Sequence, residues 1–166
     1  AVCLALGSEV LQRGGLARTL HDARTRLQHA LDSGAAAEHF ERMVAALGGP
    51  DDLILRSDRY LPVAPVHVDV AASEAGTIRA IDARRLGDLV VDLGGGRRHP
   101  DDAIDLAVGL DQVRAVGEVV SPGEPLLRLC LRNAEQLEWA RARALAAFEL
   151  GAAAEPVPLV HARIVA

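Results

Sequence analysis

Apolar residues recur at helical spacing through the first third of the chain, and glycines interrupt that pattern. The spacing predicts three consecutive helices, because apolar residues three and four positions apart share one helix face. Their expected ends are Gly14-Gly15, Ser33-Gly34 and Gly48-Gly49-Pro50. Thr19 fits the N-cap of the second helix, with Asp22 in a capping-box position. A short fourth helical piece is expected around residues 51–58.

The pattern changes to period two after a linker at residues 61–65, where two prolines favour an extended backbone. Residues 66–70 alternate apolar and polar side chains, which predicts a half-buried strand. Gly76 marks a turn, and residues 77–81 are expected to be the antiparallel partner of that strand. A β-rich part therefore follows the helices.

The rest of the chain mixes short strands with two helices. Asp82 is expected to cap the first of these helices, which the glycines at 94–96 end. Asn133 and Gln136 form a second capping-box pattern, and that helix is expected to reach about Leu150. Four strands are expected in this part, at about 105–110, 112–116, 125–131 and 157–165. Helices first and a β-rich unit afterwards define an α+β fold.

Charge and composition exclude several function classes. The net charge is −5, with both signs interspersed, which argues against nucleic acid or a membrane surface as a partner. All 18 basic residues are arginines. Schiff-base chemistry is therefore excluded. Residues 117–126 resemble the turn of biotinyl and lipoyl carrier domains, but such carriers need a lysine, so a carrier function is excluded as well.

Two cysteines, Cys3 and Cys130, are too few for a disulfide framework. We expect both to be buried free thiols, and we expect a cytoplasmic protein. The chain begins at Ala1 inside an apolar run without the basic leader of a signal peptide. The expected origin of this start is the interior of a longer polypeptide.

The run Gly94-Gly95-Gly96-Arg97-Arg98 is the strongest candidate for a binding element. Consecutive backbone N–H groups can form a concave anion site, and arginine can bind phosphate through two hydrogen bonds. The run lacks the lysine of a P-loop and the glycine spacing of a dinucleotide fingerprint. Its composition favours a helix end followed by a loop, with anion binding as the alternative.

The other residues that could carry chemistry stand singly. Asp101, Asp102 and Asp105 could bind a hard cation, but opening a turn and capping it is the simpler role. The six histidines have no metal-ligand spacing, and only His99, beside the arginines, has a suggestive setting. No serine lies in a nucleophile elbow, and Cys130 has apolar neighbours. We therefore expect no catalytic residue, no metal site and no cofactor in this chain.

Many short segments, taken together, resemble the C-terminal portion of the thymidine phosphorylases and related pyrimidine-nucleoside phosphorylases. They follow one another in the family's order over essentially the whole chain. These segments are residues 31–38, 40–44, 48–50, 60–62, 81–82, 85–87, 93–98, 102, 104–105, 108–109 and 117–126. Each is short, but their number and order make the resemblance specific.

The resemblance implies a parent enzyme with an N-terminal helical domain, a central α/β domain and a C-terminal β-rich domain. Residues 1–64 would be a helical remnant of the central domain. Residues 66–166 would form an α/β-hammerhead domain related to barrel-sandwich hybrids. The implied reaction is reversible phosphorolysis, in which the co-substrate phosphate attacks C1′ of thymidine or a related pyrimidine nucleoside. The products are the free base and 2-deoxy-α-D-ribose 1-phosphate.

The family's base-binding and phosphate-binding side chains would all precede Ala1, so the resemblance implies an inactive fragment. Within this chain it implies only that residues 94–98 face the cleft between domains and respond to its closure. The implied partners are a pyrimidine nucleoside, phosphate and the missing N-terminal domains, in a homodimeric parent. The alternative hypothesis is a stand-alone binding or scaffold module with a hammerhead fold. A third hypothesis is an anion-binding domain centred on Arg97 and Arg98.

Overall fold

A computed structural model describes residues 2–152 and 158–164, which form two compact units. The first unit contains the chain up to Tyr60 together with residues 158–164. The second unit runs from Leu61 to residue 152. The expected assignment of residues 1–64 and 66–166 to two domains of a parent enzyme stays a prediction.

The first unit is built from helices. They are α1 (Val2–Arg13), α2 (Leu20–Asp32), α3 (Ala35–Ala46) and α4 (Ser57–Tyr60). The predicted ends of the first three helices are confirmed, because Gly15, Gly34 and Gly48 follow them with φ values of 72°, 84° and 89°. Residues other than glycine rarely adopt such backbone angles. The fourth helix begins later than predicted, since residues 51–56 form turns.

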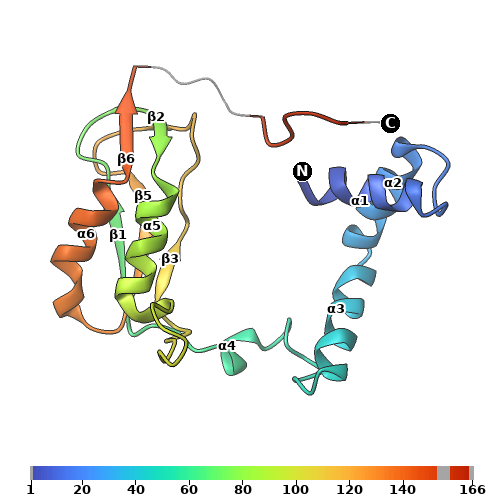
Figure 1. The fold of residues 1–166 in the computed structure, drawn as a ribbon, viewed down its shortest axis with the longest axis horizontal. Helices are drawn as coiled ribbons and strands as arrows, with labels where there is room; N and C mark the ends of the chain where they lie inside the picture. Colours follow the sequence, from blue (N-terminus) through green and yellow to red (C-terminus); the bar gives the residue numbers. More distant parts are fainter. Residues whose placement is uncertain (1, 153–157, 165–166) are drawn as a thin grey trace. The chain divides into compact units, whose positions relative to one another are not determined.

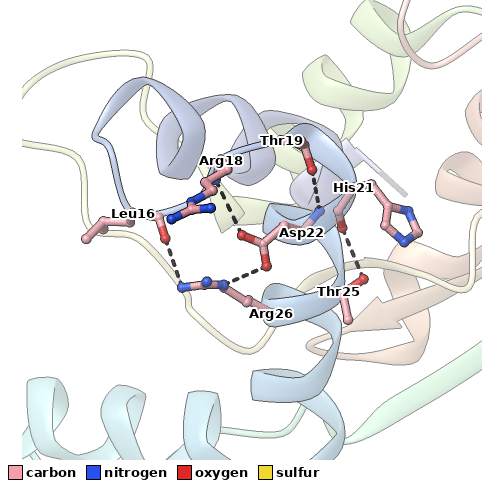
Figure 2. Close-up of polar contacts among 7 residues, drawn as sticks. All are labelled: Leu16, Arg18, Thr19, His21, Asp22, Thr25 and Arg26. Carbon is pink, nitrogen blue, oxygen red and sulfur yellow. Dashed lines mark hydrogen bonds and ion pairs between the residues drawn. The ribbon is translucent and has the colours of Figure 1, made fainter.

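The start of α2 is held by a cluster of polar contacts (Figure 2). The Thr19 hydroxyl accepts the backbone N–H of Asp22 at 3.1 Å, as predicted for an N-cap. The Asp22 carboxylate accepts the N–H of Arg18 at 3.4 Å and Nε of Arg26 at 2.9 Å. Arg26 also donates to the carbonyl of Leu16 at 2.9 Å. One half of the capping box is therefore formed. In the other half, the Asp22 carboxylate accepts the backbone N–H of Arg18 in place of the N–H of Thr19.

The second unit combines strands and helices, which confirms the predicted α+β class. Its main elements are β1 (Val66–Ala71), β2 (Gly76–Ile81), α5 (Ala83–Val90), β3 (Gly109–Asp111), β4 (Val119–Val120), β5 (Pro125–Leu131), α6 (Leu137–Leu145) and β6 (Phe148–Gly151). The strands form two antiparallel three-stranded sheets, in the orders β1–β5–β3 and β4–β2–β6. Residues 61–65 lead into β1 without regular structure, as expected for a linker.

Two apolar clusters hold the second unit together. In the larger cluster, α5 and α6 pack against the β1–β5–β3 sheet (Figure 1). Its fully buried members include Leu89, Leu127, Leu129, Leu131, Ala140 and Ala144. The smaller cluster lies on the second sheet and contains Ala72, Ile78, Val120 and Leu126. Burying these side chains stabilises the unit in proportion to the apolar area removed from water.

The predicted pairing of β1 with β2 is wrong. β1 pairs with β5, from Val66 opposite Leu131 onward, whereas β2 pairs with β4 and β6. The backbone N–H of Ala72 donates to the carbonyl of Glu124 at 2.8 Å, so the chain leaving β1 continues beside the turn before β5. Residues 73–75 then lead to β2 of the second sheet, and local alternation of side chains could not reveal this change of sheet.

The C-terminal elements also differ from the prediction. α6 ends at Leu145, not near Leu150, and Phe148 and Leu150 belong to β6, where they face Ile81 and Ile78 of β2. Residues 112–116 and the described residues 158–164 contain no strand, while Val157 and Val165 lie outside the described residues. β-branched side chains favour strands only where a neighbouring strand is available.

The helix cap predicted at Asn133 and Gln136 is formed differently. Asn133 precedes a 3₁₀ turn (Ala134–Gln136) and makes no side-chain cap, whereas the Gln136 side chain accepts the N–H of Arg132 at 2.9 Å. The glutamine half of the capping box is therefore present, one residue earlier than expected.

Candidate functional site

The candidate site is the glycine–arginine loop, defined as residues 94–98, which follows α5 in the second unit. Asp82 begins α5 as predicted, because its carboxylate accepts the N–H of Arg85 at 2.9 Å. The helix buries Leu86 and Leu89 and then widens into a π-helical turn (Val91–Gly95). Gly94 has a φ of 98°, which breaks the helix at the position that the glycines predicted.

Gly95 is required by a close approach between backbone and side chains. A Cβ on this residue would lie 2.9 Å from Cγ1 of Val90 and 3.1 Å from the carbonyl oxygen of Val108. The Gly94 carbonyl also accepts the N–H of Asp105 at 2.8 Å. The loop is therefore packed against residues 105–108 and is not a free connection.

Asp92 connects the loop to α6. Its carboxylate forms ion pairs with Arg98 of the loop and Arg143 of α6, and these two arginines hold the pKa of Asp92 below its ordinary value. The guanidinium of Arg143 also lies 5.9 Å from the ring centre of Trp139, at cation–π distance. Sequence reasoning did not identify Asp92 and Arg143. A carboxylate two residues before a glycine–arginine run is the signal that could have pointed to Asp92.

The carboxylates that could have bound a cation instead organise the backbone. Asp102 accepts the N–H groups of Arg98 and His99 at 2.9 and 2.8 Å, and these two hydrogen bonds lower its pKa. Asp105 pairs with Arg132, with Nε at 2.7 Å, and also accepts the N–H of Ala107; the arginine is the main cause of its lowered pKa. Asp102 therefore holds the residues before it and does not cap those that follow, whereas Asp105 caps the following Ala107 as expected.

Of the two arginines in the loop, only Arg97 has a guanidinium group without an ion pair among the described residues. Arg97, like Arg98 and His99, is exposed, and it forms no ion pair within the described residues. Arg98 is already paired with Asp92. Two adjacent arginines therefore do not act as a joint phosphate clamp in this arrangement, and the geometry favours Arg97 as the group that can meet a ligand or another domain.

A hollow of about 520 Å³ lies nearby, between α5 and α6. It is lined by Asp82, Arg84, Arg85, Asp88, Ala142, Arg143 and Ala146. Arg85 donates to the carbonyl of Ala146 at 3.0 Å and lies 3.6 Å from Asp82. Arg85 and Arg143 are occupied by carboxylates and a carbonyl, and Asp82 and Asp88 also line the hollow, so it offers little net positive charge to an anion.

The other candidates from the sequence are not brought together. Both cysteines are free thiols, but Cys3 is exposed and Cys130 is only partly buried, so the expected burial is wrong for Cys3. Desolvation raises the pKa of Cys130, which lowers its thiolate fraction and disfavours a nucleophilic role. Among residues 2–152 and 158–164, no group of three or more His, Cys, Asp or Glu side chains could hold a metal ion.

The ion pairs of the loop predict a dependence on pH. The pKa values of Asp92, Asp102 and Asp105 are lowered in the folded chain. Their contribution to loop stability is therefore fully present above the unfolded value of about 3.9 and is lost as the pH falls through the folded values. We expect the amide NMR signals of the loop to change in that acidic range. Asp92→Asn should remove part of this transition, and an unchanged titration would contradict the assigned pairs.

The comparisons with known proteins agree with the resemblance in the sequence. The family model described as the pyrimidine nucleoside phosphorylase C-terminal domain matches residues 77–151, which include the whole glycine–arginine loop. Residues 77–151 are therefore similar to the C-terminal domain of the pyrimidine nucleoside phosphorylases.

Curated relatives of the chain include thymidine phosphorylases. The chain is 46% identical to the one from Burkholderia cenocepacia (strain HI2424) over 98% of its own length, and 44% identical to the one from Burkholderia orbicola (strain MC0-3) over the same share. It spans 37% of the length of each of these relatives. Within the part of the chain that the structure describes, no helix combines the length and apolar character needed to cross a membrane.

Proposed function

We propose that this chain is the non-catalytic C-terminal part of a thymidine phosphorylase. The observation that carries the proposal is the 46% identity to a thymidine phosphorylase over 98% of the chain. The proposed reaction of the whole protein is phosphorolysis of thymidine to thymine and 2-deoxy-α-D-ribose 1-phosphate, with phosphate as co-substrate and no other cofactor. The proposal includes a cytoplasmic, homodimeric parent enzyme.

The glycine–arginine loop is proposed to act at the cleft between domains, as a docking or closure element. Two properties support this role. Asp92 and Asp102 hold the backbone and Arg98 in place, while Arg97 remains exposed without an ion pair in the described part of the chain. A fixed backbone that presents one guanidinium can pair with a carboxylate or phosphate at little cost in conformational entropy.

The first unit is proposed to be the remnant of a central domain. Phe40 and Met43 of α3 and its C-cap residue Leu47 follow helical spacing on one face and are 44%, 50% and 82% exposed. No residue of α3 is buried. A helix with an uncovered apolar face needs a partner surface. The chain spans 37% of the relatives, and the rest of such a protein is proposed to cover this face of α3. The hammerhead arrangement of residues 66–166 remains part of the same proposal.

The experiment is an assay of thymine release from thymidine and phosphate. We expect no turnover from this chain alone, because the proposed catalytic groups lie outside it. Turnover should appear when the chain is joined to the N-terminal part of a Burkholderia relative, and Arg97→Ala should reduce it. Arg84→Ala, which removes an exposed arginine from α5, is the matched control. Robust turnover by the chain alone would contradict the proposal. A folded but inactive fusion would favour a stand-alone module.

A further inference from the structure

The C-terminal segment of the chain, residues 158–164, returns to the first unit and lies beside α1 and α2 (Figure 1). Arg163 forms a bidentate ion pair with Glu9 of α1, and the contact between Nη2 and Oε2 measures 3.1 Å. These residues are 154 positions apart in sequence. Bidentate arginine–carboxylate pairs fix both distance and orientation, so this contact defines how the segment lies on α1.

The segment lines a cavity together with α1 and α2. Val160, Ala162, Arg163 and Ile164 line the same cavity as residues of these helices. The helix residues that line it are Ala5, Leu6, Ser8, Glu9, Arg13, Leu20 and Arg24. Arg163 is therefore the residue that fixes the segment on α1, through the carboxylate of Glu9.

The contact between the segment and the helices buries little of the segment, as expected for docking that is reversible. The cavity below the segment has a volume of about 420 Å³, and Val160 and Ile164 remain 49% and 90% exposed. The segment therefore covers the apolar groove without filling it. Exposed ion pairs are individually weak. Their effect grows when a short linker keeps the two partners at a high local concentration.

The first unit contains both the beginning of the chain and residues 158–164, with the second unit between them in sequence. The chain passes from the first unit to the second at residues 60–61, and residues 158–164 belong to the first unit again. We infer that the groove between α1 and α2 is a docking site for this chain's own residues 158–164, and that the docked segment is a strap that attaches the second unit at a second point. A release of Arg163 would leave residues 61–65 as the only attachment.

The test uses the full chain and two matched variants. Arg163→Gln removes the pair in the strap. Arg42→Gln removes an exposed arginine of α3, in the same unit, that does not line the cavity. The readout is the heteronuclear ¹⁵N NOE of Val160, Ala162 and Ile164. We expect helix-like values in the native chain and in Arg42→Gln, and a fall to values of a free chain end in Arg163→Gln. Free-end values in the native chain, or no loss in Arg163→Gln, would overturn the docking.

Two further measurements separate docking from the strap function. A peptide of residues 158–166 should shift the amide signals of Ala5, Ser8 and Leu20 in Arg163→Gln more than in the native chain, whose own segment competes for the groove. The overall tumbling times of both units should fall in Arg163→Gln, because one of two attachments is lost. Unchanged tumbling after release of the segment would overturn the strap, and equal peptide binding by both proteins would overturn the self-occupied groove.

Discussion

Replacing Leu129 with alanine is expected to destabilise the second unit by about 2–5 kcal/mol, the usual range for truncating a buried leucine. Leu129 is fully buried in the centre of β5, and its backbone faces Val68 on one side and Leu110 on the other. The neighbouring strands hold the backbone, so the core cannot close around the missing atoms. A cavity and its lost contacts should remain.

Urea unfolding followed by tryptophan fluorescence measures this effect. The chain contains one tryptophan, Trp139, and it lies on α6 of the second unit. Val119→Ala is the control, since Val119 is 72% exposed in β4 and should change the free energy of unfolding by no more than about 0.5 kcal/mol. Equal effects of the two substitutions would contradict the assigned core.

Replacing Gly95 with alanine is expected to destabilise the same unit by about 1–3 kcal/mol, the range for overpacking a filled site. The added methyl group would meet Cγ1 of Val90 at 2.9 Å and the backbone carbonyl of Val108 at 3.1 Å. A valine side chain rotates little at χ1, and a carbonyl in a packed loop has no easy alternative position. The glycine–arginine loop should shift away from residues 105–108.

Gly87→Ala is the matched control for this substitution. Gly87 lies on the exposed side of α5, and a Cβ there would have no atom within 4 Å. Alanine is the better helix former by about 1 kcal/mol, so this variant should be more stable than the native chain. The two glycine-to-alanine changes should therefore differ in sign in the same unfolding measurement. A stabilising Gly95→Ala would show that the loop is not packed as described.

Local signals in the sequence were sufficient for the first three helices and for the helix that leads to the loop. The ends of α1, α2 and α3 follow from Gly15, Gly34 and Gly48, and Thr19 begins α2 as predicted. Asp82 and Gly94 likewise bound the helix that leads to the loop. Caps and left-handed glycines act within one helical turn, so a short stretch of sequence contains all the information that they need.

Pairings between distant segments could not be predicted in this way. Phe148 and Leu150 follow α6 without a stop signal, and they form β6 only because Ile81 and Ile78 of β2 lie opposite them. The same limit applies to the candidate site. The sequence identified the glycine–arginine loop, but Arg143 reaches Asp92 from 51 residues away, and Arg132 reaches Asp105 from 27 residues away.

The sequence by itself determined the α+β order, the ends of α1, α2 and α3, the place of the loop and the resemblance to the family whose C-terminal domain model matches residues 77–151. The tertiary structure decided which strands share a sheet, which arginine of the loop is committed to Asp92, and that residues 158–164 return to α1. The physical reason is the range of the interactions. Backbone conformation and capping depend on immediate neighbours, whereas strand pairing and ion pairs depend on groups that only the folded chain brings within a few ångströms.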